Sequence, residues 1–589
     1  MAELSSQPTS VQSVYSWHNE ERLYVNRRYQ RKLVWTLEEK QKLIESLLKK
    51  YPIPAILLAE KESGDGVYEI IDGLQRLNAI TSFIEGAFPT LDGRYFDISS
   101  FPTAQSRLAE GKFSPASQEK KLSIKEISIL LDYSMAFSIM RGATNEEVDD
   151  VFDRINSYGH RLSDQERRQS GIQNSFSELV RHLACKIRGD SSPEFMLISK
   201  MPEISIDLPM MRHGYDIKAD EVFWVQQGIL NSTDLRDSMD EQCIADIVGS
   251  IISGTILERA KDVLDKIYAR GSAESNQMLT ALGVYGSETL AGEFEYCINE
   301  IIQVCNATKT EKLRNIIYSK RNTNAFPAVF AVLFIAFHDL FVNEKKSISN
   351  YIGVKGAITN ITDRIVTSRQ ATSPEERQKN VDTIKALVSP HFVNIDPTKL
   401  IYANHSSLDI DSYIRCSGME LAHFELKQGV VSLGDKREIN RDLINRIVNT
   451  ICALANNGPN RTGRIVLGVA DKDDDVKRII ELDSITPRQV GAWTVVGVNR
   501  EAKALGISLE DYHNLIRSSI EKSELSNPLK NSVLSSIDFN AYYGLGIIII
   551  TIPEQQEPSY VGDDMYWRDG DNTKIATGAK QIAEIGRRF

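Results

Sequence analysis

The sequence lacks the cysteine spacing that holds a structural metal. Its six cysteines are spread over 589 residues, without a Cys-x-x-Cys pair and without histidines nearby at ligand spacing. A structural zinc site needs closely spaced sulfur and nitrogen ligands. The sequence therefore excludes the zinc-finger and zinc-ribbon classes. The cysteines are Cys185, Cys243, Cys297, Cys305, Cys416 and Cys452.

Long apolar segments are also missing. The longest apolar run, residues 326–337, is shorter than the roughly 20 residues that a helix needs to cross a bilayer. The opening residues, Met1 to Ser6, lack the apolar core of a signal peptide. We therefore expect a cytoplasmic protein without membrane contact. We also predict that residues 326–337 form a buried helix.

The chain has no excess of positive charge. Its formal net charge is -11 and its pI is near 5.5. A surface coated with basic residues is therefore excluded, and any contact with nucleic acid must come from a local patch. The alternative for such a patch is an ordinary solvated face. The candidate residues are Arg22, Arg27, Arg28, Arg31 and Lys32.

No internal repeat or low-complexity tract divides the chain. A chain of this length is expected to hold three or four domain-sized units. The patterns of strands and helices predict an α/β nucleotide-type domain over residues 1–170 and a mainly helical domain over 171–390. A polar linker over 391–412 and a mixed C-terminal domain over 413–589 follow. The predicted fold class is α/β and α+β multidomain.

The chain does contain a dense polar motif, Ile70-Ile71-Asp72-Gly73-Leu74-Gln75-Arg76-Leu77. Residues 67–71 have the pattern of a short buried strand. The apolar spacing of Leu77, Ile80 and Ile84 predicts a helix that ends at Gly86. The polar residues thus lie at a helix N-terminus, where backbone N–H groups and the helix dipole favour an anion.

Each polar residue of this motif suits a phosphate site. Gly73 lets the backbone approach a ligand closely, and Arg76 can fork two hydrogen bonds onto a phosphate. Asp72 can hold a metal ion or polarise a water, and Gln75 adds an amide. The alternative is that Asp72 caps an ordinary helix while Arg76 is solvated. The four residues alone do not decide between these interpretations.

The segments before the motif supply a family resemblance. Residues 29–31 read Tyr-Gln-Arg, and Trp35 precedes a helix with a capping box at Thr36 and Glu39. Pro-Ile-Pro at residues 52–54 ends that helix, and the strand and Asp-Gly-x-Gln-Arg follow. This order resembles the N-terminal domain of GmrSD-type restriction enzymes. The resemblance implies a ParB-like core that binds and hydrolyses a nucleoside triphosphate.

A second block supports this resemblance. A helix predicted from about residue 144 to Gly159 reads Phe-x-Arg-x-Asn at residues 152–156, and Leu-Ser-x-x-Glu follows at 162–166. Both patterns resemble segments of the family. The residues of the second pattern are better explained as another capping box, formed by Ser163 and Glu166.

The resemblance implies that Arg154 and Asn156 face the loop that carries Asp72 and Arg76. It therefore assigns two groups of residues to this domain. The predicted nucleotide-binding residues are Gln30, Arg31, Gly73, Arg154 and Asn156, and the predicted catalytic residues are Asp72, Gln75 and Arg76.

The last domain carries a second polar pattern. Residues 424–427 alternate apolar and polar side chains, so in a strand Glu425 and Lys427 share one face. Glu420 lies upstream, and Asp471 ends a predicted strand over 464–471. Three carboxylates beside a lysine can bind Mg²⁺ or Mn²⁺ and activate a water for phosphodiester cleavage. The alternative is that Glu425 and Lys427 simply pair on a sheet surface.

This domain resembles the Schlafen, or AlbA-like, family. The shared pattern is Glu, four residues and Glu-x-Lys, then a helix ending Ala-x-Ala-Asn at residues 453–456 and a strand ending Gly-Val-x-Asp at 468–471. A β-branched strand over 546–552 and Tyr-x-Arg-x-Gly at 566–570 also fit. The loop over 457–463 is longer than the family's glycine pair. It leaves the position of Asp471 relative to the glutamates open.

The Schlafen resemblance implies a nuclease site with a divalent metal. Glu420, Glu425 and Asp471 are its predicted metal ligands and catalytic residues, and Lys427 is expected near the scissile phosphate. Members of this family also divide in function, since some cleave tRNA or other nucleic acid and others bind DNA as regulators. No His-Asn-His nuclease signature is present.

The combined interpretation is a prokaryotic defence protein of restriction or abortive-infection type. In it, a nucleoside triphosphate is the substrate or effector of a sensor domain that governs a nuclease acting on DNA or tRNA. One rival is a non-nucleolytic DNA-binding regulator that uses nucleotide as a clamp signal. Another is an assembly module whose sites have decayed. A homo-oligomer is compatible with all three.

Overall fold

The computed structural model divides the chain into two compact units, Met1–Thr398 and Lys399–Phe589. Helices and strands mix in both units, which confirms the predicted α/β and α+β multidomain class. The structure describes residues 3–27, 32–60, 66–116, 120–144, 147–148, 150–152, 154, 163–169, 174–190, 195–211, 214–367, 369–398, 410–411, 413–414, 423–434, 436–459, 462–470, 472–540, 542, 544–569 and 572–589.

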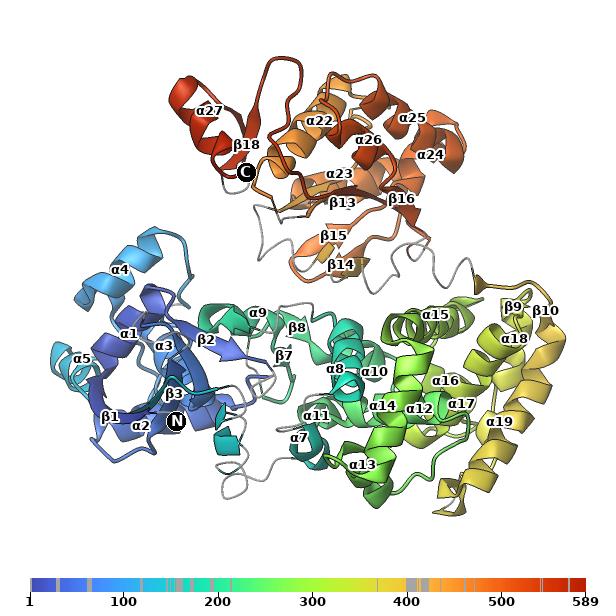
Figure 1. The fold of residues 1–589 in the computed structure, drawn as a ribbon, viewed down its shortest axis with the longest axis horizontal. Coiled ribbons are helices and arrows are strands. Elements are labelled where there is room, and N and C mark those ends of the chain that lie inside the picture. Colours follow the sequence, from blue (N-terminus) through green and yellow to red (C-terminus); the bar gives the residue numbers. More distant parts are fainter. Residues whose placement is uncertain are drawn as a thin grey trace. The chain divides into compact units, whose positions relative to one another are not determined.

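A six-stranded sheet forms the N-terminal part of the first unit (Figure 1). Its strand order is β1-β5-β3-β4-β2-β6, with parallel pairs β2/β4 and β3/β5 and antiparallel pairs elsewhere. The strands are β1 Glu3–Ser10, β2 Leu23–Asn26, β3 Ile56–Glu60, β4 Tyr68–Asp72, β5 Ser134–Arg141 and β6 Phe195–Leu197. The helices of this part are α1 Val11–Asn19, α2 Leu37–Leu48, α3 Leu74–Ile84, α4 Pro102–Ala109 and α5 Ile124–Leu131.

Three predicted elements around the polar motif are confirmed. The strand predicted over residues 67–71 is β4, and the helix predicted after it is α3. The capping box before α2 is also present, because the Thr36 side chain accepts from the Glu39 backbone N–H and the Glu39 carboxylate accepts from the Thr36 N–H. Local sequence signals therefore placed the motif correctly between a strand and a helix.

The rest of the first unit is mainly helical and is built around α17. Residues 326–337 lie almost wholly in this helix, which confirms the predicted buried helix. A helix that is apolar on all sides is stable only when surrounded, and α17 contacts α12, α15 and α19. The helices are α7 Asp164–Gln169, α8 Ser175–Arg188, α9 Met201–Ile204, α10 Phe223–Gln226, α11 Ser232–Arg236, α12 Met239–Ile252, α13 Lys261–Tyr268, α14 Ala273–Tyr285, α15 Ser287–Asn306, α16 Leu313–Ile317, α17 Pro327–His338, α18 Tyr351–Ile358 and α19 Pro374–Val388.

Two helices of this part, α12 and α13, are separated by a turn. The chain leaves α12 after Ile252 and turns at Gly254, whose φ of +66° is accessible to glycine at little cost, before α13 begins. Within the part of the chain that the structure describes, no helix is both long and apolar enough to cross a membrane. The remaining short strands of this unit are β7 Ile206–Asp207, β8 Ile217–Lys218, β9 Ser347–Ile348 and β10 Phe392–Val393.

Buried charges join the sheet to the helices. Arg188 at the end of α8 bonds Asp240 at 2.5 and 2.7 Å and Glu241 at 2.8 Å, and all three residues are buried. Arg27, just after β2, pairs with Asp190. Opposite charges at such contacts offset part of the cost of removing both from water.

The described members of the candidate basic patch near the N-terminus make contacts within the first unit. Arg27 is buried against Asp190, and Arg22 donates to the carbonyl of Gly66 at 2.6 Å. Lys32 donates to the Leu235 carbonyl at 2.5 Å and to Ser238 at 3.1 Å, and burial together with nearby Arg188 lowers its pKa. These cations are used inside the unit. Arg28 and Arg31 lie outside the described residues.

A four-stranded sheet of order β11-β12-β17-β16 forms the centre of the second unit. β11 and β12 are parallel and the other pairs are antiparallel. The strands are β11 Phe424–Lys427, β12 Gly463–Leu467, β13 Val469–Ala470, β14 Arg488–Val490, β15 Trp493–Val495, β16 Ile537–Asn540, β17 Ile547–Ile552, β18 Tyr566–Asp569 and β19 Asn572–Ile575. The helices are α22 Arg441–Ala455, α23 Asp473–Asp483, α24 Asn499–Leu505, α25 Leu509–Glu521, α26 Leu529–Leu534 and α27 Ala579–Gly586.

The strand predicted over residues 464–471 is broken at Gly468. The first part, β12, belongs to the central sheet, whereas β13 pairs with β15 in a separate three-stranded sheet. Gly468 has φ +109°, and a Cβ there would lie 3.1 Å from the Cα of Gly497. A continuous strand requires neither a positive φ nor such a close contact. The strand is therefore interrupted where the backbones of Gly468 and Gly497 approach each other.

The predicted linker over residues 391–412 contains structured residues at both ends. Phe392 and Val393 form β10, which pairs with β9 of the first unit. Ile410 and Ile414 are fully buried in the second unit, in a cluster with Leu426, Val466 and Tyr542 among others. Residues 399–409 lie outside the described part.

Lys40 is a buried cation to which the described residues offer no carboxylate partner. It lies on α2, is 6% exposed, and its ammonium nitrogen lies 5.3 Å from the ring centroid of Tyr215 and 5.8 Å from that of Phe88. Burial lowers the pKa of Lys40 from an ordinary value of 10.5 to about 8. The fold therefore disfavours the charged form of Lys40, and the two ring faces offset part of that cost.

We predict that Lys40→Met stabilises the protein near pH 7. The lowered pKa corresponds to about 3 kcal/mol, of which lost ring contacts offset up to about 1 kcal/mol. Between about pH 8 and pH 10 the unfolded chain binds one more proton than the folded chain at Lys40, so the stability of the native protein rises with pH in this window. Lys40→Met removes that rise. Urea denaturation at several pH values measures both effects.

The control is Lys42→Met, on the exposed side of the same helix, where Lys42 pairs with Glu38. It should leave the rise above pH 8 intact. A Lys40→Met protein that keeps the same pH dependence as the native chain would contradict this account.

Candidate functional site

The motif of residues 70–77 lies at the turn from β4 into α3. Gly73 is the N-cap of α3 and has φ +105°, and a Cβ at this position would lie 2.9 Å from the Ile56 side chain. Any other residue would be strained by both the backbone angle and the contact. Gly73 therefore allows the chain to turn directly from the sheet edge into the helix.

Arg76 is held inside the protein. It is 8% exposed, and its guanidinium donates to the Ala55 carbonyl at 3.2 Å, to the Pro54 carbonyl and to the Asp72 carboxylate at 2.7 Å. The guanidinium thus ties α3 to the segment before β3. Asp72 keeps 44% of its side chain exposed, so its free oxygen faces solvent while Arg76 fixes the other.

Gln75 fastens the segment that precedes α2. Its carbonyl oxygen accepts from the backbone N–H groups of Val34 at 3.0 Å and Trp35 at 3.2 Å, and its amide donates to the Lys32 carbonyl at 2.8 Å. One side chain therefore satisfies three backbone groups. These hydrogen bonds connect the motif with residues 32–35. The predicted nucleotide-binding residues Gln30 and Arg31 come just before this segment in the sequence and lie outside the described residues.

The second block packs against the strand that carries the motif. Val148 and Phe152 share a buried cluster with Ile71 of β4, next to Asp72, and with Leu57 and Met140. Arg154 is 74% exposed and donates to Asp150 at 2.9 Å. Asn156 lies outside the described residues, so its predicted approach to the motif stays a prediction.

The capping box predicted at Ser163 is confirmed. The Ser163 N–H donates to the Glu166 carboxylate at 2.9 Å, and the Glu166 N–H donates to the Ser163 hydroxyl at 3.2 Å. Glu166 is thus used to begin α7, as the local pattern indicated.

In the second unit, Glu425 and Lys427 share one face of the edge strand β11, as predicted. The two side chains form an ion pair. Arg568 of β18 donates to the other Glu425 oxygen at 2.8 Å, to the Thr573 hydroxyl at 3.2 Å and to the Phe424 carbonyl at 3.4 Å. Both Glu425 oxygens therefore have a cationic partner.

Only one of the three predicted metal ligands can be examined. Glu420 and Asp471 lie outside the described residues, and among the described ones no group of three or more His, Cys, Asp and Glu side chains is arranged to hold a metal ion. A divalent cation at Glu425 would have to share the carboxylate with Lys427 and Arg568 or displace one of them. The predicted strand is broken at Gly468, so β13, the last described segment before Asp471, pairs with β15 and not with the central sheet.

Two further residues of this site were not predicted from the sequence as site residues. In the sequence, Arg568 was noted only as the arginine of the Tyr-x-Arg-x-Gly pattern. An arginine that is buried in a strand requires an anionic partner. Glu501 is fully buried under the loop after β11 and accepts from the backbone N–H groups of Val430 at 2.8 Å and Val431 at 3.2 Å and from the Tyr512 hydroxyl at 2.5 Å. Burial raises the pKa of Glu501, and Arg500 opposes that rise.

The asparagine that ends the Ala-x-Ala-Asn pattern has a structural role. Asn456, at the end of α22, accepts from the Ser559 N–H at 2.8 Å and donates to the carbonyls of Ser559 at 2.9 Å and Tyr566 at 2.8 Å. This fully buried side chain fixes the chain that leads into β18. It thereby helps to position Arg568 against β11.

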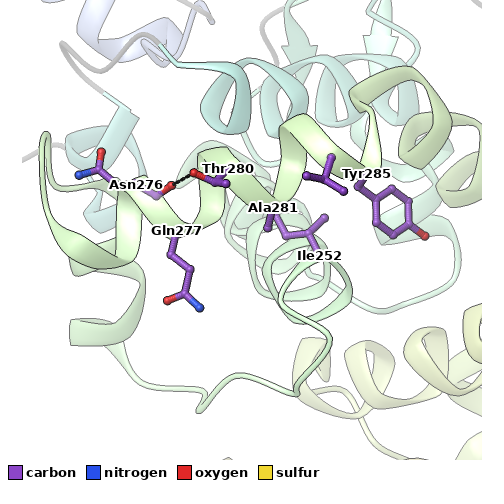
Figure 2. A pocket seen from close by; sticks show the side chains of 7 residues that line it. Ile252, Asn276, Gln277, Thr280, Ala281 and Tyr285 are labelled. Carbon is purple, nitrogen blue, oxygen red and sulfur yellow. Dashed lines mark hydrogen bonds between the residues drawn. The ribbon is translucent and has the colours of Figure 1, made fainter.

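A hollow of about 600 Å³ lies on α14, and none of the predicted site residues is among its lining residues (Figure 2). Asn276 and Thr280, both on this helix, are joined by a hydrogen bond from the Thr280 hydroxyl to the Asn276 carbonyl at 2.9 Å. The lining has no charged side chain. The lining residues are Ile252, Asn276, Gln277, Thr280, Ala281, Val284 and Tyr285.

Comparison with known proteins supports both resemblances seen in the sequence. Residues 14–172 match the family model described as GmrSD restriction endonuclease, N-terminal domain, and residues 420–577 match the one described as Schlafen, AlbA_2. No curated protein and no solved structure matches the chain. The two matches indicate a function related to restriction-like defence or to nucleases. The chain is thus similar to GmrSD restriction endonucleases over its N-terminal part and to Schlafen proteins over its C-terminal part.

Proposed function

We propose that this chain is a prokaryotic anti-phage defence protein. Its N-terminal domain hydrolyses a nucleoside triphosphate and acts as a sensor, and its Schlafen-like domain is a metal-dependent nuclease under that sensor's control. The observation that carries the proposal is the junction of β4 and α3, where a half-exposed carboxylate stands at a glycine-capped helix N-terminus. The two family matches support it.

The proposed nucleotide site uses the helix end and the Asp72 carboxylate. The first-turn N–H groups of α3 face a bound phosphate, and Gly73 keeps side-chain atoms away from it. Asp72 orients a water or a divalent ion toward the phosphate. Arg76, bonded to Asp72 and to the carbonyls before β3, acts by holding that carboxylate in place.

The proposed nuclease site lies at the edge strand β11. Glu425, with Glu420 and Asp471, would hold Mg²⁺ or Mn²⁺, and the bound ion would supply an activated water and neutralise charge on the phosphate. Lys427 lies on the same strand face as Glu425 and is placed to contact the scissile phosphate.

One observation favours a second candidate function for the same domain. Each Glu425 oxygen has a cationic partner, Lys427 for one and Arg568 for the other. A carboxylate that is already paired with two cations suits a site that binds a nucleic-acid backbone without holding a metal ion for cleavage. The second candidate is therefore a DNA-binding regulator in which nucleotide serves as a clamp signal.

We predict that Asp72→Asn lowers nucleotide hydrolysis by about 10²-fold or more, the usual cost of removing a charge that stabilises the transition state. Release of inorganic phosphate from ATP, GTP and CTP by the full chain, with Mg²⁺ present, measures the effect. The substitution keeps the size of the side chain and its acceptor for Arg76, so the fold should survive.

Glu110→Gln is the matched control, because Glu110 is an exposed carboxylate of the same domain at the end of α4. It should hydrolyse nucleotide at the native rate. Native rates in Asp72→Asn would remove Asp72 from the site, and phosphate release from no nucleotide in the native chain would end the proposal for this domain.

We predict that Glu425→Gln abolishes cleavage of nucleic acid by the Schlafen-like domain. Loss of a carboxylate ligand weakens metal binding and removes the charge that the ion neutralises. Incubation of the full chain with tRNA or single-stranded DNA and Mn²⁺, followed by gel analysis of the strands, tests this outcome. Glu510→Gln, an exposed acid on α25, is the control. Cleavage that persists in Glu425→Gln would favour a contaminating nuclease or a different site.

A further inference from the structure

The helical part of the first unit carries a basic segment, residues 309–321. The segment contains five cations and one acid, in a chain whose formal net charge is -11. Four of the five cationic side chains are exposed and the fifth, Arg314, is half-buried. None of the five forms an ion pair within the part of the chain that the structure describes. The cations are Lys309, Lys312, Arg314, Lys320 and Arg321.

Hydrogen bonds hold the basic segment against α18 and the turn that follows it. Ahead of α16, the Lys355 ammonium on α18 donates to the Lys309 carbonyl at 2.6 Å. In α16 itself, the Ile316 carbonyl accepts from the Asn360 N–H at 2.9 Å. α16 therefore lies beside α18 (Figure 1). Because the backbone that carries the cations is fixed, binding of a ligand does not have to order it first.

The acids that contact the basic segment are matched by cations outside it. Glu311, the acid within the segment, pairs with Lys355 at 3.1 Å. Asp363, in the turn after α18, accepts from the Ser319 hydroxyl at 3.0 Å, and the exposed cation Arg364 follows it directly. The basic segment therefore keeps an excess of positive charge, although the chain as a whole is acidic.

Arg314 is a cation for which the described residues supply no carboxylate partner. Its Nε and one terminal nitrogen are buried without a hydrogen-bond partner among those residues. The guanidinium lies 5.9 Å from the ring centroid of Phe326, and a Cβ at Gly228 would lie 2.8 Å from its Nε. Burial lowers the pKa of Arg314, and nearby Tyr318 and Asp234 oppose that shift. An anion bound to the guanidinium would satisfy the buried N–H groups.

We propose that the basic segment binds the sugar–phosphate backbone of a nucleic acid and that Arg314 contacts one of its phosphates directly. A chain of phosphates can engage several cations of one segment at once, whereas a single small anion cannot. The segment lies outside both regions that match a family model. The proposal rests on the proposed function only for the class of ligand, and it adds a contact surface in the first unit.

The direct test is acetylation of lysines in the full chain, followed by mass spectrometry, with and without saturating nucleic acid in EDTA. Single-stranded DNA, RNA of the same sequence and duplex DNA are the three probes. Bound nucleic acid should slow acetylation of Lys312 and Lys320 about fivefold or more, because an ammonium held by a phosphate is withdrawn from the reagent. Lys379, an exposed lysine of α19 that pairs with Glu376, should react at an unchanged rate.

Binding affinity gives a second readout, by fluorescence anisotropy over a range of salt in EDTA. The triple substitution Lys312→Gln, Lys320→Gln and Arg321→Gln should weaken binding of single-stranded DNA about 10²-fold near 0.1 M salt and lower the salt slope by about 2, the share of three phosphate contacts. All three side chains are exposed, so the fold should survive.

The matched control removes three exposed lysines that are paired with acids elsewhere in the same unit. It carries the same change of net charge, so it separates a local contact from the general effect of charge. It should change affinity by less than about twofold. The substitutions are Lys218→Gln, Lys345→Gln and Lys379→Gln.

Arg314→Met tests the direct contact, because it removes the charge and keeps an unbranched stem against Phe326. It should weaken binding about fivefold and lower the salt slope by about 0.7, the share of one phosphate. Since Arg314 has no carboxylate partner among the described residues, its loss should not lower the melting temperature. A purely structural role predicts the reverse, a lower melting temperature with native affinity.

The proposal is overturned if bound nucleic acid leaves Lys312 and Lys320 as reactive as before, if the triple variant binds like its control, or if the native chain binds none of the three probes. None of these measurements involves a divalent ion or a nucleotide. A failure of Mn²⁺-dependent cleavage or of nucleotide hydrolysis would therefore count against the proposed function and not against this surface.

Discussion

A buried arginine must be met by carboxylates or carbonyls, and this requirement fixes how the main parts of each unit join. Arg188 on α8 is neutralised by two acids at the start of α12, and Arg377 on α19 is held by Asp246 of α12 at 2.8 and 2.9 Å. Arg76 fastens α3 to the segment before β3, and Arg568 fastens β18 to β11. The ion pairs of Arg76 with Asp72 and of Arg568 with Glu425 also orient the two carboxylates that the proposed chemistry uses. The same contact therefore contributes to stability and to function.

Much of the fold near the two motifs was predictable because local signals specify it. The capping box at Thr36, the junction of strand and helix around Gly73 and the alternation over residues 424–427 each have one short-range physical cause, and the structure confirms all three. The buried helix over residues 326–337 was likewise evident, since an apolar run of that length must be surrounded by other elements.

The partners of the polar side chains were not predictable, because they are distant in sequence. Arg568 reaches Glu425 across 143 positions, and Lys32 reaches Leu235 across 203. The residues next to Gln75 in the sequence do not indicate that its side-chain amide bonds the backbone of residues 32–35. The strand break at Gly468 also depends on a distant glycine, Gly497, whose backbone lies against it. Such features follow from tertiary packing, which outweighs local propensity.

The account's central claim is that nucleotide at the N-terminal site controls the Schlafen-like domain. The most direct measurement is the rate of Mn²⁺-dependent strand cleavage by the full chain with and without nucleoside triphosphate, for the native protein and for Asp72→Asn. A useful switch needs a ligand that favours one state by about 3 to 5 kcal/mol, so nucleotide should change the native cleavage rate by about 10²-fold or more. Asp72→Asn should abolish that response. A native cleavage rate that nucleotide leaves unchanged would contradict the claim and leave two domains that are merely tethered.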